Sequence, residues 1–177
     1  MKQRRFALTL CSVVLVLGAV TSCGDDPTAL SQYGALNSAA ESYNVARAQN
    51  NRIQATCRKL SDRRRLDCWA NFFDFVSKSN RSIAVKLADV STGLTAPCGP
   101  TVKRWSEALQ AEGLLREKMA RLTRSLPPTT IGKSQGVRVY GLSLRSAALY
   151  EKANAQRKAV PKACTSYFLE RGALRPD

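Results

Sequence analysis

Residue types that commonly perform catalysis are scarce in this chain of 177 residues, which contains no histidine. Without histidine the chain has no Ser-His or Cys-His nucleophilic pair, no HExxH zinc site and no Glu-x-x-His di-iron site. Gly132-Lys133-Ser134 matches the end of a phosphate-binding loop, but Pro127 stands where that motif needs its first glycine. A Ser-Lys hydrolase is the remaining enzymatic alternative, and no serine is marked for that role. We therefore expect a protein that is not an enzyme, with no metal site and no cofactor.

The first 23 residues have the pattern of an export signal. Lys2, Arg4 and Arg5 precede an apolar run over residues 6–20, which leads into Val20-Thr21-Ser22-Cys23. A charged start, a short apolar run and a small-residue exit are typical of a targeting peptide. The run of about 15 residues is shorter than the roughly 20 residues that a helix needs to cross a bilayer.

The end of this segment resembles the lipobox of bacterial lipoproteins. The resemblance implies that the signal is cleaved before Cys23 and that Cys23 is diacylated, which would hold the protein stably at a membrane surface. The alternative is an ordinary cleaved signal with Cys23 merely near the cut. We predict a signal peptide over residues 1–22, a lipidated cysteine and tether over residues 23–30, and one domain over residues 31–177. The predicted location is a bacterial membrane, on its exported side (periplasmic or cell surface).

The chain is strongly basic, with a formal net charge of +15. Only three of its 28 basic residues and none of its 13 acidic residues lie in residues 1–22, so residues 23–177 carry +12, and +9 of this falls in residues 101–177. Such a surplus predicts attraction to anionic lipid headgroups, wall polymers or an envelope protein, and no nucleic-acid partner is expected outside the cytoplasm. The alternative is a solvated basic surface that maintains solubility.

Apolar residues recur at steps of three and four along four stretches, which predicts four helices. The first runs over residues 36–60, the third over residues 101–126 and the fourth over residues 139–160. The second has the clearest stripe: Leu66, Trp69, Phe73, Val76, Asn80, Ile83, Leu87, Val90 and Leu94. Asn80 within this stripe is expected to set the helix register or to contact a buried water.

These stretches predict an all-α fold, an up-and-down bundle of about four long helices with a short C-terminal helical segment. Residues 129–136 are expected to form a loop. Pro161 is expected to kink or restart the fourth helix, with a final segment that ends near Gly172.

Four cysteines remain beyond Cys23, and an even number in an exported domain predicts two disulfides with three possible pairings. In the up-and-down topology Cys57 and Cys68 flank one turn, whereas Cys98 and Cys164 lie at the opposite end. The other pairings would bridge opposite ends of helices about 40 Å long. We therefore predict that Cys57–Cys68 and Cys98–Cys164 staple the bundle.

One segment combines arginines with aromatic residues near the turn between the first two helices. Arg63, Arg64 and Arg65 precede Phe72 and Phe75, which lie beside the core stripe. Aromatic residues at this spacing are typical of core packing. The alternative is an exposed aromatic surface next to the arginines, which would favour binding of a partner. The candidate partner-binding residues are therefore Arg63, Arg64, Arg65, Phe72 and Phe75.

The leading hypothesis is a lipid-anchored, non-enzymatic protein that binds an anionic or protein partner at the bacterial envelope. One alternative is a structural spacer or scaffold. A third hypothesis is suggested by exclusion and immunity lipoproteins, which act against an incoming phage, plasmid or toxin. They resemble this design in being small, anchored and non-catalytic.

Overall fold

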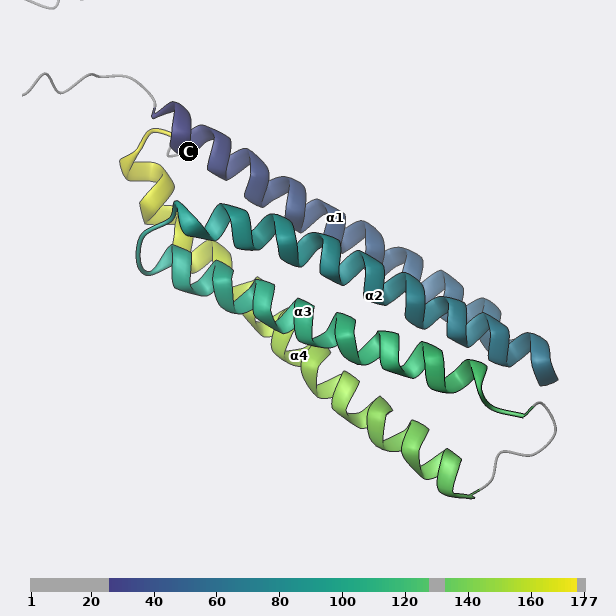
Figure 1. Cartoon of the computed structure of the whole chain (residues 1–177). Helices are drawn as coiled ribbons and strands as arrows, with labels where there is room; N and C mark the ends of the chain where they lie inside the picture. Colours follow the sequence, from purple (N-terminus) through teal and green to yellow (C-terminus); the bar gives the residue numbers. More distant parts are fainter. Residues whose placement is uncertain (1–25, 128–132, 175–177) are drawn as a thin grey trace, which may run out of the picture.

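The computed structural model describes residues 26–127 and 133–174, which contain four helices and no strand. The helices are α1 (Pro27–Arg58), α2 (Asp62–Thr92), α3 (Cys98–Arg124) and α4 (Lys133–Glu170). Successive helices run in opposite directions along an elongated bundle (Figure 1). The predicted all-α bundle of four long helices is confirmed.

The two ends of the bundle carry different parts of the chain. The start of α1, the α2–α3 turn and the end of α4 lie together at what we call the proximal end (Figure 1). The α1–α2 turn, the end of α3 and the start of α4 lie at the opposite, distal end. Asp26, the first described residue, therefore lies at the proximal end. The predicted signal peptide and Cys23 fall in residues 1–25, which lie outside the described residues.

Helix α1 begins earlier than the predicted domain boundary. The Asp26 carboxylate accepts hydrogen bonds from the backbone N–H of Thr28 (2.9 Å) and of Ala29 (3.3 Å), and Pro27 occupies the first helical position. Both features stabilise a helix start. Ala29 is buried, so residues 27–30, predicted as part of a tether, form the first turn of α1 instead.

Helix α4 extends beyond the predicted helix in both directions. It begins at Lys133, so residues 133–136 of the predicted loop are helical, and residues 129–132 lie outside the described residues. It also continues through Pro161 to Glu170, and the predicted C-terminal segment is therefore its last turns, before Gly172 adopts a positive φ. Burial of Tyr167 and Phe168 in these turns offsets the helical hydrogen bond that Pro161 cannot donate.

Both predicted disulfides are confirmed. Cys57–Cys68 closes the distal α1–α2 turn, with the two Cα atoms 5.4 Å apart. Cys98–Cys164 joins the start of α3 to α4 at the proximal end, with the two Cα atoms 4.5 Å apart.

The core consists of two apolar clusters, one above the other along the bundle. The larger, proximal cluster is centred on Leu87, Trp105 and Leu109, and the distal cluster contains Phe72 and Met119. Helices α2 and α3 form the most extensive contact, whereas α1 and α4 contact each other little. The bundle is therefore built on the α2–α3 pair, with α1 and α4 packed beside it.

Gly113 permits the close approach of α2 and α3. A Cβ atom at this position would lie 2.8 Å from Cγ of Arg81 and 3.2 Å from the carbonyl oxygen of Ser77. A second close contact joins the same helices nearby, where the buried Ser106 hydroxyl donates to the Ala84 carbonyl at 2.7 Å. These contacts allow α2 and α3 to pack closely along the middle of the bundle.

Candidate binding site in the distal half

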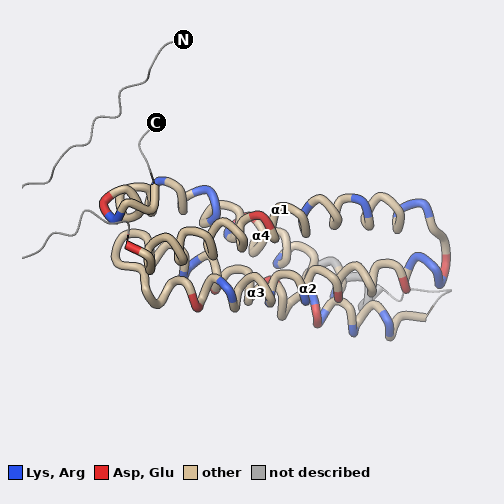
Figure 2. Tube along the Cα trace, turned by 90° about the horizontal axis from the view of Figure 1, so that it is seen from above, with Lys and Arg blue, Asp and Glu red and all other residues tan. Residues whose placement is uncertain are grey.

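The predicted arginine triplet lies on the first turn of α2, and all three side chains are exposed. Lys and Arg are concentrated at the distal α1–α2 turn (Figure 2). Arg63 pairs with Asp67 at 3.0 Å and donates to the Leu126 carbonyl at 3.4 Å, and Arg65 donates to the Leu60 carbonyl. Two of the three arginines therefore also hold the distal turn together.

Arg64 differs from its neighbours because its side chain makes no hydrogen bond or ion pair with the described part of the chain. Arg58 and Lys59 are exposed on the adjoining end of α1. We call the five basic residues Arg58, Lys59, Arg63, Arg64 and Arg65 the arginine tip. Asp62 and Asp67 are its acidic neighbours, so the tip keeps a positive surplus.

The structure separates the two phenylalanines that the sequence grouped with the arginines. Phe72 is only 2% exposed and packs against Trp69, with ring centroids 5.5 Å apart. Its placement on an exposed partner surface is therefore wrong, and it belongs to the core. Phe75 is half-buried and lines a shallow pocket between α1 and α2 with Val45 and Lys86.

A cavity of about 440 Å³ lies in the distal half of the bundle, and all four helices line it. Its floor consists of buried residues of α2 and α3, among them Phe72, Phe73 and Met119. Its rim includes exposed residues of α1 and α4, such as Asn51 and Ala147. We call this space the distal cavity, and its mouth lies between the two helices that contact each other little.

Arginines cover the aromatic groups of the distal cavity. The guanidinium of Arg116 lies 5.6 Å from the ring centre of Phe73 and 5.7 Å from that of Phe72. At the rim, the guanidinium of Arg47 lies 5.5 Å from the ring centre of Tyr150, which brings α1 and α4 together across the mouth. Cation–π contacts of this kind are each worth about 0.5–1 kcal/mol at exposed sites and more where water is excluded.

A buried polar layer separates the distal cluster from the proximal cluster. Glu112 is 2% exposed and accepts a hydrogen bond from the Asn80 amide at 3.0 Å and contacts from the Arg116 guanidinium at 3.4 Å. Burial raises the pKa of Glu112, and the Arg116 charge and the hydrogen bonds from Arg116 and Asn80 oppose this shift. Burial also lowers the pKa of Arg116, against the attraction of Glu112. Asn80 thus has a protein partner within its apolar stripe.

The raised pKa of Glu112 predicts a pH-dependent stability. Between the ordinary pKa of a glutamate and the raised value, the native state binds more protons than the unfolded state. The free energy of unfolding should therefore fall as the pH rises through this window. The Glu112→Gln variant should lack this component. Urea unfolding of both proteins at a series of pH values would measure it, because the other carboxyl groups cancel in the difference.

A charge change next to Glu112 provides the control for this effect. Arg116→Met removes the opposing charge, so the upper limit of the window should move to higher pH. A wild-type minus Glu112→Gln difference that stays constant across the whole pH series would contradict the expected coupling.

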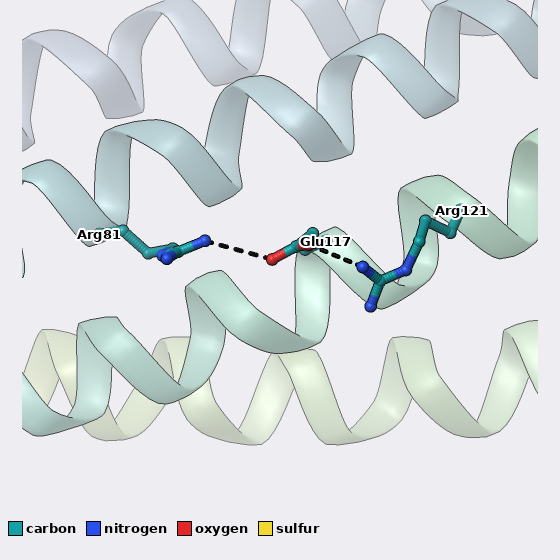
Figure 3. A network of polar contacts seen from close by, with 3 residues as sticks. All are labelled: Arg81, Glu117 and Arg121. Carbon is teal, nitrogen blue, oxygen red and sulfur yellow. Dashed lines mark hydrogen bonds and ion pairs between the residues drawn. The ribbon is translucent and has the colours of Figure 1, made fainter.

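A second, exposed network shows how position changes the value of an ion pair. Glu117 accepts from Arg121 on its own helix at 2.7 Å and from Arg81 of α2 at 3.2 Å (Figure 3). Glu112–Arg116 has the same spacing of four residues but is buried. The exposed pairs each contribute only a few tenths of a kcal/mol to stability. The buried Glu112–Arg116 pair instead forms part of the wall of the distal cavity.

No family model, curated protein or solved structure matches this chain. Within residues 26–127 and 133–174, no group of three or more His, Cys, Asp or Glu residues is arranged to hold a metal ion. Over the same residues, no helix is both long enough and apolar enough to span a membrane. The chemistry of the arginine tip and the distal cavity is therefore the basis for inferring function.

The distal cavity was not predicted, although the sequence contains a signal for it. Asn50 stands at the step between Ala46 and Ile53 in the apolar stripe of α1, as Asn80 does in that of α2. Asn50 lines the cavity, and its side-chain oxygen is buried without a hydrogen-bond partner among the described residues. An amide within an otherwise apolar stripe is a sequence signal for a buried polar group.

Proposed function

We propose that this chain is a lipid-anchored, non-enzymatic protein of the bacterial envelope that binds an anionic partner through its arginine tip. The observation that carries the proposal is the arrangement of the two ends. The chain that leads to Cys23 joins the bundle at the proximal end, and the arginine tip lies at the distal end. An anchor at Cys23 would therefore hold the tip away from the membrane surface.

The bundle is long enough to place the arginine tip well away from a membrane surface to which Cys23 is anchored. Helix α1 contains 32 residues, which corresponds to about 48 Å at 1.5 Å per residue. The same length supports the second candidate function, a spacer or scaffold that needs no specific partner. The two functions differ in whether the tip must be positively charged.

Charge reversal at the tip tests the proposal. Arg64→Glu is the cleanest change because the Arg64 side chain makes no hydrogen bond or ion pair in the described structure. Arg63→Glu/Arg64→Glu/Arg65→Glu is the stronger change. We expect affinity capture from intact envelopes to lose the anionic partner with both variants, because like charges repel and rim charges control association. A spacer should retain its associations in both.

The matched control reverses three exposed basic residues elsewhere on the bundle, Lys152, Lys158 and Lys162 of α4. This variant has the same net charge as the triple tip variant and should keep the partner. Equal loss in both variants would contradict a specific tip and indicate bulk electrostatic adhesion. A Cys23→Ser variant should be released from the membrane fraction, and its retention there would contradict the proposed anchor.

A further inference from the structure

The distal cavity has the size of a site for a small molecule and is half open to solvent. Its volume of about 440 Å³ lies within the range of about 300–1,000 Å³ that is typical of small-ligand sites. Its floor is apolar and aromatic, while charged and amide groups line its rim. We propose that the distal cavity binds a small organic anion with a flat aromatic body.

The charges around the cavity favour an anion. Among the described residues, Glu112 is the one carboxylate in the lining, and both of its oxygens are already engaged by Asn80 and Arg116. Arg47 at the rim lies over the Tyr150 ring and makes no ion pair within the described structure. One positive charge at the mouth is therefore left without a carboxylate partner, and a ligand carboxylate would supply it.

The floor favours a flat aromatic body. Trp69 and Phe73 lie nearly parallel, with ring centroids 5.9 Å apart and an interplanar angle of 30°. Phe72 and Met119 complete an apolar surface at the same level. A planar ring that stacks on such a surface gains apolar burial and offset-stacking energy together.

An unsatisfied amide indicates a further feature of the ligand. The side-chain oxygen of Asn50 is buried, lines the cavity and has no hydrogen-bond partner among the described residues. A buried acceptor of this kind is costly unless a donor reaches it. A hydroxyl or N–H group on the aromatic body would satisfy Asn50 while the carboxylate binds Arg47.

Isothermal titration of the processed protein with 2-naphthoate and with 2-naphthamide tests the proposal, because the two probes share one ring system and differ in charge. The titration is done in detergent because of the proposed lipid on Cys23. The heats of titrating each probe into the same detergent without protein are subtracted. We expect one naphthoate per chain, bound about tenfold more tightly than the amide. Arg47→Met should weaken naphthoate binding about tenfold more than it weakens amide binding, because only naphthoate loses a charge partner.

Two further variants complete the test. Arg52→Met makes the same substitution on an exposed residue of α1 outside the cavity lining and should bind naphthoate as wild type does. Ala147→Trp places an indole at the rim and should abolish binding of both probes while far-ultraviolet circular dichroism stays unchanged. Arg64→Glu should leave naphthoate binding intact, so this site and the arginine tip succeed or fail separately.

Three results would overturn the proposal. The first is no naphthoate binding by the wild-type protein, which would mean that the cavity holds only solvent. The second is equal affinity for the two probes, or an equal loss in Arg47→Met and Arg52→Met, either of which would remove the role of the Arg47 charge. The third is undiminished binding in Ala147→Trp, which would place the bound probe elsewhere on the bundle.

Discussion

Removing the Cys98–Cys164 disulfide is expected to lower the free energy of unfolding by about 4 kcal/mol. The reason lies in the unfolded chain, because this disulfide joins residues 66 positions apart. A closed loop of that length removes more conformational freedom from the unfolded state than a short loop does. The disulfide also fixes α4, which contacts α1 little, to the α2–α3 pair. Urea unfolding of a Cys98→Ala/Cys164→Ala variant would measure the loss.

The second disulfide provides the matched comparison. Cys57 and Cys68 are only 11 positions apart, so Cys57→Ala/Cys68→Ala should cost about 3 kcal/mol. Each variant replaces two cysteines by alanines within the same fold. A smaller loss for the proximal disulfide than for the distal one would contradict the loop-length argument.

Phe72→Ala is expected to destabilise the protein by about 3–5 kcal/mol. The ring is 2% exposed, packs against Trp69 and Phe73, and is covered by the guanidinium of Arg116. Truncation leaves a void next to the distal cavity and removes the cation–π contact. Thermal and urea unfolding of the variant would measure the loss.

Phe75→Ala is the control for this substitution. Phe75 lies three residues further along the same helix, but it is half-buried at the α1–α2 surface. Its truncation removes less buried area, so its cost should remain below that of Phe72→Ala. Equal costs would show that exposure does not distinguish the two rings. If Phe75 contributes to partner binding, Phe75→Ala should reduce affinity capture at little cost in stability.

A polar layer borders the distal cavity. Asn80, Glu112 and Arg116 interrupt the apolar packing between the two core clusters. Fixed partners hold these groups, so they cannot rearrange to fill space as apolar side chains do. Because α1 and α4 contact each other little, the space beside the layer stays open at their mouth.

Helix count, order and disulfide pairing were predictable from the sequence, for local reasons. An apolar period of three and four residues specifies a helix with one buried face, and proline and glycine residues mark the turns. Once successive helices alternate in direction, Cys57 and Cys68 lie at one end of the bundle and Cys98 and Cys164 at the other. Only the pairing within each end joins cysteines that are close together. The errors occurred at helix boundaries. The cap at Asp26 and the burial of Phe168 extend helices through segments that local signals had marked as tether or break.

The candidate site was only partly predictable. Arg63, Arg64 and Arg65 of the arginine tip follow from the sequence, because a run of three arginines beside a turn is exposed in most arrangements of the helices. Arg58 and Lys59 were added by the structure. The choice between core and surface for Phe72 and Phe75 stayed open because both flank the same apolar stripe. Their separation depends on where α1 and α3 pack against α2, which the period of a single helix does not specify.

The sequence by itself determined the class of fold and the basic distal turn, because each depends on residue type and local spacing. It also determined the two disulfides, once successive helices are taken to alternate in direction. Only the tertiary structure decided that Glu112–Arg116 is buried while Glu117–Arg121 stays on the surface, although both pairs share the same spacing. The same holds for the distal cavity, whose walls come from four helices. Burial is a property of how helices pack against one another, so identical local patterns acquire different energies and different functions.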